Sequence, residues 1–370
     1  MLTNYFNLVG SFAMHFTELH STLVLSSRDV QAIALEVGLD TLMDRLIQRL
    51  SSLMQSFDEV QTAIPIRSGF NYHLPHTGLV EWMPLHQKGE QVTIKVVGYH
   101  PQNPQRYQVP TILSTISAYD VRTGHLRALM DGVFLTALRT GAASAVASRL
   151  LALPQSKTLG LIGCGAQAVT QLHALSRIFD FDRICFYDVD PQAASTFTNR
   201  CAAFELSATF EASSIEQIVN QSDIICTATS LDVGQGPLFD QLSSQEHLHV
   251  NAVGADFPGK TELPLSLLQE SFVCPDFRDQ AIKEGECQQL KAEEIGADIL
   301  TVIKQAQAFQ PYHNQRTVYD STGWALQDYA VMQLFIEHAT DLGVGQRIPI
   351  ENIQQDAKNP YEFYHVPIAK

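Results

Sequence analysis

The pattern of apolar and polar positions in the first third of the chain predicts two helices followed by an antiparallel sheet. Ser26 and Ser27 precede a run that ends at Gly38, which is typical of a capped helix. Between residues 40 and 57 the apolar residues recur on one helical face: Leu42, Met43, Leu46, Ile47, Leu50, Leu53 and Met54. Apolar runs at 78–84, 91–100, 110–119 and 126–130 then predict strands, with a hairpin turn at 120–124. Residues 1–25 show no clear pattern, and we interpret them as an extension of undefined structure.

From residue 134 onward, short apolar runs alternate with helical segments, which is the pattern of a doubly wound α/β sheet. Helices are expected at 134–151, 167–177, 191–204 and 323–342, and from Ser214. Strands are expected at 158–162, 183–187, 223–227, 249–253, 271–274 and 317–319, with a weaker one near Ala208. Three prolines, Pro349, Pro360 and Pro367, predict an irregular C-terminal end.

A dinucleotide-binding motif lies at the start of this alternation. The strand at 158–162 is followed by G-x-G-x-x-A, in which Gly163, Gly165 and Ala168 allow a tight turn, close approach of a pyrophosphate and packing of the next helix. The N-terminus of that helix favours phosphate groups. Asp188 ends the next strand, where its carboxylate can accept hydrogen bonds from the ribose hydroxyls of NAD. We predict an NAD site, with NAD preferred over NADP because Asp188 would repel a 2′-phosphate and no arginine immediately follows it.

Composition and charge narrow the class of protein. A chain of 370 residues suits two domains, and a net charge of −15 argues against nucleic-acid and anionic-membrane partners. No apolar run reaches the ~18–20 residues of a membrane span. The six cysteines are scattered without a C-x-x-C motif, which favours a reducing, cytoplasmic setting. The thirteen histidines form no metal-binding pattern, so we predict no metal site.

The block at 250–263, V-N-A-V-G-A-D-F-P-G-K-T-E-L, contains a candidate for proton transfer. Its strand ends in a glycine turn that is followed by Asp256. Ligands of doubly wound sheets lie beyond the carboxyl ends of the strands, so Asp256 is expected to face the nicotinamide. Lys260 follows four residues later. The alternative interpretation is an Asx-type turn with a solvated lysine.

Arg67, Lys95 and Arg139 are candidates for binding an anion in this acidic chain. Lys95 lies in a run of valines and isoleucine, where an unpaired charge would be costly to bury. Its partner could be Glu81, in an internal ion pair, or a substrate carboxylate, which arginine can also hold bidentately. The pattern alone does not choose between the two.

The chain resembles the ornithine cyclodeaminase/mu-crystallin family from about residue 67 to 350. The resemblance is carried by I-K-V-V-G-Y-H-P, L-R-T-G-A-A-S (138–144), G-C-G-A-Q-A, the block at 250–263, E-G-E-C-Q-Q-L (284–290) and Y-D-S-T-G-W-A-L-Q-D-Y (319–329). It implies that Asp256 is the catalytic acid/base and that Arg67, Glu81, Lys95 and Thr322 contact the substrate. The cofactor contacts that it implies are Thr111, Arg139, Ala166, Gln167, Asp188, Thr229, Val250, Asn251, Ala252, Val253, Lys260 and Ser321.

The same resemblance implies an activity and an assembly. The activity is NAD-dependent conversion of L-ornithine to L-proline and ammonia, in a homodimer. The expected architecture is an α/β fold with a Rossmann domain at 152–318. An α+β domain for substrate binding and dimerisation is then built from both termini, residues 1–151 and 319–370.

Three departures from the family leave the reaction and substrate open. Thr322 and Pro110 stand where the cyclodeaminase has valine and histidine, and extra residues separate Arg67 from Glu81. An amino-acid dehydrogenase or ketimine reductase is therefore an alternative. A crystallin-type binding protein is a third possibility. The retention of Asp256 together with Arg67 and Lys95 counts against it.

Overall fold

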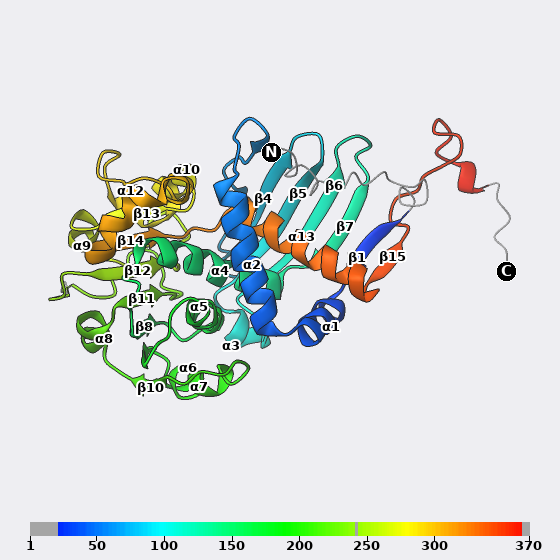
Figure 1. Ribbon diagram of the computed structural model, residues 1–370. Coiled ribbons are helices and arrows are strands. Elements are labelled where there is room, and N and C mark those ends of the chain that lie inside the picture. Colours follow the sequence, from blue (N-terminus) through cyan, green and yellow to red (C-terminus); the bar gives the residue numbers. More distant parts are fainter. Residues whose placement is uncertain (1–20, 241–242, 365–370) are drawn as a thin grey trace, which may run out of the picture.

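The computed structural model describes residues 21–240 and 243–364 of the chain. Within these residues the strands form two sheets, each accompanied by helices (Figure 1). Most of the N-terminal extension predicted at 1–25 lies outside the described residues, but its last part forms strand β1 (Thr22–Leu25). In the described part of the chain, no helix combines the length and apolar content that a membrane span requires.

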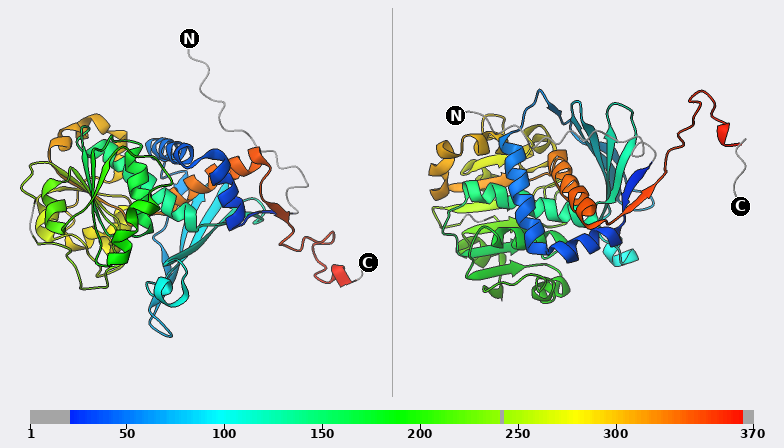
Figure 2. Two further views of the ribbon diagram at one scale, coloured as in Figure 1. Left: turned by 90° about the horizontal axis from the view of Figure 1, so that it is seen from below. Right: turned by 45° about the vertical axis from the view of Figure 1, so that its right-hand side comes forward.

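The first sheet is mainly antiparallel and contains the predicted strands of the N-terminal third. Its order is β15 (Gln346–Ile348), β1, β7 (Leu126–Asp131), β6 (Ile112–Asp120), β5 (Gln91–Tyr99), β4 (Gly78–Gln87) and β2 (Thr62–Ala63), with β3 (Ser68–Tyr72) paired to β4. The pair β1–β7 is parallel. Helices α1 (Ser27–Val37), α2 (Leu39–Gln55) and α13 (Ala325–Leu342) lie together on one side of this sheet (Figure 2).

The helices of this first part form where the hydrophobic pattern predicts them. Ser26 caps α1 in a capping box with Asp29, and Gly38 ends the helix at φ +85°. The predicted apolar face of α2 is buried except for Leu53, which is partly buried. The C-terminal helix α13 returns to pack against α2, β4 and β5. Both ends of the chain therefore contribute to one hydrophobic core.

The second sheet is parallel and has the doubly wound arrangement predicted for it. Its order is β10 (Thr209–Ala212), β9 (Arg183–Tyr187), β8 (Thr158–Ile162), β11 (Ile224–Thr227), β12 (Leu248–Ala252), β14 (Arg316–Asp320) and β13 (Phe272–Pro275). Figure 2 shows helices on both faces, among them α5 (Ala166–Ser176), α8 (Ile215–Gln221), α9 (Leu265–Gln269), α10 (Arg278–Glu284), α11 (Ile299–Lys304) and α12 (Ala306–Phe309). The strand order reverses between β8 and β11, which is where such sheets bind ligands. The predicted α/β fold class is confirmed.

Helix α4 (Val133–Leu151) connects the two sheets and is buried along most of its length. Its small residues permit close packing on α5: a Cβ at Gly141 would collide with the main-chain carbonyl of Thr170. The helix also packs against α2, α13, β12 and β14. It therefore fixes the position of Arg139 relative to both sheets.

Some local predictions were wrong. The single helix expected at 191–204 is two short helices, α6 (Pro191–Ser195) and α7 (Phe197–Arg200). At the break, the Thr196 hydroxyl donates to the Gln192 carbonyl at 2.8 Å, in competition with the helical hydrogen bonds. Strands β1, β2, β3 and β15 and helices α3 (Asn103–Tyr107), α9, α10, α11 and α12 were not predicted. All six cysteines are free thiols with buried side chains, whereas the cytoplasmic location stays a prediction.

Candidate active site

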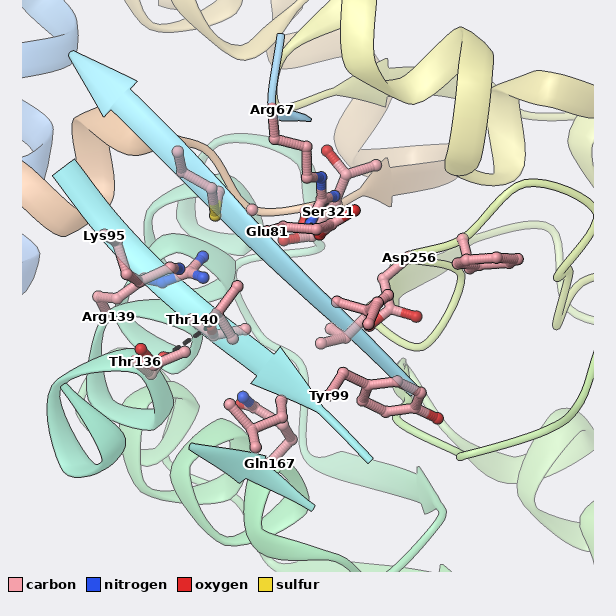
Figure 3. Close-up of a pocket in the computed structure, with 18 residues that line it drawn as sticks. Arg67, Glu81, Lys95, Tyr99, Thr136, Arg139, Thr140, Gln167, Asp256 and Ser321 are labelled. Carbon is pink, nitrogen blue, oxygen red and sulfur yellow. Dashed lines mark hydrogen bonds and ion pairs between the residues drawn. The ribbon is translucent and has the colours of Figure 1, made fainter. Parts of the chain in front are cut away.

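A cavity lies between the two sheets, beyond the carboxyl ends of β8, β12 and β14 (Figure 3). Its empty volume is about 710 Å³, part of it continuous with solvent. All the residues predicted to contact the substrate or to transfer protons line it together with Arg139, which was predicted as a cofactor contact: Arg67, Glu81, Lys95, Asp256 and Thr322. Leu79, Met83, Val97, Ile112 and Phe257 provide an apolar wall. The fold thus brings charged residues from distant parts of the sequence to the position where doubly wound sheets bind ligands.

Arg67 lies in the irregular segment before β3 and is held at two of its three nitrogens. Its Nε lies 2.8 Å from Glu284, and its Nη2 donates to the carbonyl oxygen of Thr322 at 2.9 Å. Glu81 lies further away, 3.8 Å from Nη1. Burial raises the pKa of Glu284, and the charge of Arg67 lowers it. The effect of burial is larger, so the pKa of Glu284 is raised to about 7. The Nη1 edge of Arg67 and the Glu81 carboxylate therefore remain for a ligand.

Lys95 has a partner that the sequence did not indicate. The internal ion pair considered with Glu81 is wrong, because Lys95 Nζ lies 3.0 Å from Asp328 on α13. The same Asp328 oxygen lies 3.1 Å from Arg139 Nε. Burial and the nearby Arg139 charge lower the pKa of Lys95 to about 7, against the opposing effect of Asp328. One wall of the cavity thus carries two cations that share a carboxylate.

Asp256 follows β12, and its carboxylate lies on the opposite side of the cavity from Lys95 (Figure 3). Lys260 Nζ lies 3.0 Å from Asp256 Oδ1 and 5.5 Å from the centre of the Tyr99 ring. The alternative of a solvated lysine is wrong, since Lys260 is only 4% exposed. Burial lowers the pKa of Lys260, but the opposing effect of Asp256 and Tyr99 is larger. The pKa of Lys260 is therefore raised. The predicted contact of Lys260 with the cofactor stays a prediction.

The Thr322 hydroxyl already has a hydrogen-bond partner in the protein and does not serve as a free donor in the cavity. Its hydroxyl donates to the buried Asp276 carboxylate at 3.0 Å, and the Gly323 amide donates to the other oxygen at 2.6 Å. The Thr322 methyl group and main chain are then what remains for a ligand. Threonine can therefore replace the valine of the family pattern at similar volume without adding a free hydroxyl.

The glycine turn after β8 has the geometry that a dinucleotide requires. Gly163 has φ +94°, and a Cβ there would collide with the Ala228 carbonyl. A Cβ at Gly165 would meet nothing within 4 Å, so the main chain is open to a ligand at this point. Asp188 Oδ2 accepts from the Cys164 amide at 2.7 Å, which places the carboxylate beside the turn. Ala166 and Gln167 begin α5, whose N-terminus faces the same space.

The remaining predicted cofactor contacts lie at the ends of neighbouring strands. Val250, Asn251 and Ala252 belong to β12 and are buried, so a ligand could reach only their main chain or that of Val253. The Thr229 amide and hydroxyl both donate to Glu262. Thr111 immediately precedes β6. Ser321 follows β14, and its buried hydroxyl has no hydrogen-bond partner within the part of the chain that the structure describes. A free buried donor and an open glycine turn fit a bound dinucleotide.

Comparison with known proteins shows the family. The sequence profile of the ornithine cyclodeaminase/mu-crystallin family matches residues 28–342. The chain belongs to this family. An L-lysine cyclodeaminase of Streptomyces rapamycinicus is 41% identical over 343 residues, covering 92% of this chain and 99% of that protein.

Two solved structures of family members are also similar. A lysine cyclodeaminase described for its recognition of L-lysine, L-ornithine and L-2,4-diaminobutyric acid has a TM-score of 0.89 at 47% identity, over 92% of this chain and 99% of its own. An archaeal alanine dehydrogenase dimer with bound NAD has a TM-score of 0.78 at 30% identity, over 90% and 100%. Cyclodeaminases and dehydrogenases thus share this family fold.

Four buried carboxylates at the site were missed from the sequence: Glu262, Asp276, Glu284 and Asp328. Each occurs in a motif that the family resemblance uses or close to one, but acidic residues give no periodic signal. Glu262, for example, holds the Thr229 and Gly254 amides and so fixes the loops after β11 and β12 to each other. The signal that could have found them is an acidic residue within an otherwise apolar or glycine-rich block.

Proposed function

We propose that the chain is an NAD-dependent cyclodeaminase of a small L-diamino acid, with L-ornithine and L-lysine as the candidate substrates. The product from L-ornithine is L-proline with release of ammonia, and L-lysine gives the six-membered analogue. An NAD-dependent amino-acid dehydrogenase is the second candidate, supported by the similarity to the archaeal alanine dehydrogenase.

The observation that carries the first proposal is the pairing of charges around one cavity. Arg67, Lys95 and Arg139 suit the carboxylate of an amino acid. Two carboxylates, Glu81 and Asp256, line the same cavity. A dehydrogenase that acts on alanine needs only one of these carboxylates, as a base. A diamino acid has two amines, and each amine can interact with one of the two carboxylates. The apolar wall suits the methylene groups between the two amines.

The roles of the residues follow from this arrangement. Arg67, Lys95 and Arg139 bind the substrate carboxylate, and Glu81 accepts a hydrogen bond from the distal amine. Burial raises the pKa of Glu81, and the nearby Arg67 charge opposes this rise. Asp256 accepts a proton as the distal amine attacks Cα and donates one to the departing ammonia. Lys260 Nζ, 3.0 Å from Asp256 Oδ1, holds the Asp256 carboxylate in position.

NAD would be held at the glycine turn of Gly163 and Gly165, by Asp188 at the ribose and by Ser321 near the cavity. The chemistry that it supplies, when bound, is reversible hydride transfer at the Cα carbon of the amino acid. Most of the side chains around the cavity are buried or half-buried, which limits the access of water to a bound substrate. Substrate loses its α-amino group without net oxidation.

A homodimer through the first sheet is part of the proposal. Strand alternation turns Trp82, Val96 and Leu113 away from the core formed with α2 and α13. These side chains are 36%, 39% and 45% exposed, and Trp82 lies directly opposite Val96 in the β4–β5 pair. Contiguous apolar surface on a sheet is typical of an interface. The similar alanine dehydrogenase is described as a dimer.

The test is to incubate the purified protein with NAD and L-ornithine, L-lysine or L-alanine, and to measure ammonia and NADH separately. A cyclodeaminase releases ammonia from a diamino acid without accumulating NADH. Stoichiometric NADH, above all with L-alanine, would support the dehydrogenase instead. Binding of NAD and an amino acid with neither product would indicate a crystallin-type binding protein.

A further inference from the structure

Asp328 is the carboxylate that joins the two cations on one wall of the cavity. It lies in the first turn of α13, and its side chain is fully buried. Its Oδ1 lies 3.0 Å from Lys95 Nζ and 3.1 Å from Arg139 Nε. The preceding residue, Gln327, accepts a hydrogen bond from Arg139 Nη1. The first turn of α13 therefore fixes both cations.

Two buried cations side by side would repel each other without this carboxylate. Lys95 is 1% exposed and Arg139 5%, so water screens neither charge effectively. Arginine stays charged in proteins, and the repulsion would therefore be relieved by loss of a proton from the lysine. While Lys95 is protonated, Asp328 leaves the three groups with a single excess positive charge, which matches the single negative charge of one carboxylate ligand.

We propose that Asp328 is a positioning residue for the substrate carboxylate: it favours the charged form of Lys95 and holds Arg139 beside it, so that the two cations bind one carboxylate together. Lys95 and Arg139 line the cavity, and Asp328 acts through them. The inference rests on the proposed function, because the bound carboxylate is that of the diamino acid.

The charges around Lys95 give the direction of the effect. Burial, Arg139 and Arg67 lower the pKa of Lys95, and Asp328 raises it by its charge and hydrogen bond, for a result of about 7. Glu81 also faces Lys95 from β4. Removal of the Asp328 charge must lower the pKa of Lys95 further. A lysine is charged below its pKa. The charged fraction of Lys95 in the variant should therefore fall below that of the wild type most strongly at neutral and alkaline pH.

The kinetic test compares Asp328→Asn with the wild type between pH 6 and pH 8. A pKa lowered by about one unit reduces the charged fraction of Lys95 roughly tenfold at pH 8 but only about twofold at pH 6. We expect KM for the diamino acid to follow these factors, with a smaller change in kcat. Asp328→Glu, which restores the charge, should recover the wild-type pH profile at least in part. A KM ratio that is the same at pH 6 and pH 8 would overturn the proposal.

A second measurement does not depend on catalysis. The Lys95–Asp328 ion pair exists in the wild type only while Lys95 is charged, so Asp328→Asn should lower Tm more at pH 6 than at pH 9. In a Lys95→Met background, the Tm loss caused by Asp328→Asn should be the same at pH 6 and pH 9. The matched control is Asp120→Asn, which removes a buried carboxylate paired with Arg122 in the β6–β7 turn. Arg122 and the turn amides lower the pKa of Asp120 to about 2, so the Tm loss of that variant should not change between pH 6 and pH 9.

The two measurements separate the possible failures. If the wild type turns over no diamino acid, the proposed function is wrong, and the Tm comparison still decides the role of Asp328. If Asp328→Asn does not fold, Asp328→Glu and the double variant Lys95→Met/Asp328→Asn, which removes both charges, take its place. A Tm loss of Asp328→Asn that is equal at pH 6 and pH 9 would mean that Asp328 only supports Arg139 and the packing of α13.

Discussion

Asp256, which lines the cavity, forms an ion pair with Lys260, with 3.0 Å between Oδ1 and Nζ. The lysine is buried against Tyr99, whereas the aspartate side chain remains 31% exposed. An aspartate that serves only to shape a turn has no need of a buried cationic partner. The pair therefore supports the interpretation of Asp256 as the group that transfers protons.

Asp256→Asn should lower turnover of the best diamino acid by about 10²–10⁴-fold, the usual contribution of a general acid/base group. Asparagine keeps the size of the side chain but cannot accept a proton. NAD affinity should hardly change, because the glycine turn and Asp188 are left intact; titration of NADH fluorescence measures this. Near-normal turnover would make Lys95 the next candidate for proton transfer. A collapse of NAD affinity would instead identify Asp256 as a structural turn residue.

The parts of the fold that the sequence predicts are those with local signals. Gly163 and Asp188 belong to one β-α-β unit, in which turn, helix and strand follow each other along the chain. By contrast, β1 and β15 pair with each other and lie at one end of the first sheet. Such short strands depend on a partner distant in sequence rather than on their own pattern. The break at Thr196 coincides with one side-chain hydrogen bond, from the Thr196 hydroxyl to the Gln192 carbonyl.

The candidate site shows the same limit. The motif residues Arg67, Lys95 and Asp256 do meet in one cavity, and family resemblance was enough to select them. Asp328 is separated from Lys95 by 233 positions, and no periodicity relates the two. Burial of a lysine predicts that some anion neutralises it, but only the folded structure identifies which one.

Asp188→Ser should reduce the preference for NAD over NADP. The carboxylate lies beside the glycine turn, where it accepts from the amides of Cys164 and Asp190 at 2.7 and 2.8 Å. Serine removes both the acceptors for the ribose hydroxyls and the repulsion of a 2′-phosphate. We expect NADH to bind more weakly and NADPH more tightly in fluorescence titrations. Comparable affinity of the wild type for both cofactors would show that Asp188 does not select between them.

Glu81→Gln tests recognition of the distal amine. A hydrogen bond to a charged group contributes roughly 1.5–3 kcal/mol, so KM for L-ornithine or L-lysine should rise about 10–100-fold. The comparison ligand is L-norvaline, which has the carbon chain of ornithine but lacks the distal amine. Its affinity, measured by inhibition, should change little in the variant. An equal loss for both ligands would place Glu81 at the carboxylate end, as a support for Arg67.

Val96→Glu tests the proposed dimer. Val96 lies on the outer face of β5 opposite Trp82, and a charge there would have to be buried in the interface. We expect the wild type to sediment as a dimer at micromolar concentration and the variant as a monomer. The control is Leu35→Glu on α1, which is 86% exposed and lies away from that face. A monomeric wild type would refute the assembly itself.

Binding of a simple carboxylate should be coupled to proton uptake above neutral pH. The pKa of Lys95 is lowered to about 7, mainly by burial and by Arg139, so at pH 8 most molecules of the ligand-free protein carry a neutral lysine. A bound carboxylate favours the charged form and draws a proton onto Lys95. Pentanoate is a suitable ligand because it has the carbon chain of ornithine and no amine that could titrate.

Calorimetric titrations with pentanoate in buffers of different ionisation enthalpy count the protons taken up. Uptake should approach one proton per ligand at pH 8 and fall towards zero at pH 6, where Lys95 is already charged. Lys95→Met should abolish the uptake at pH 8 and weaken binding at both pH values. If uptake at pH 8 persisted in Lys95→Met, the proton would belong to another group, and Glu284, whose pKa burial raises to about 7, would be the first to test.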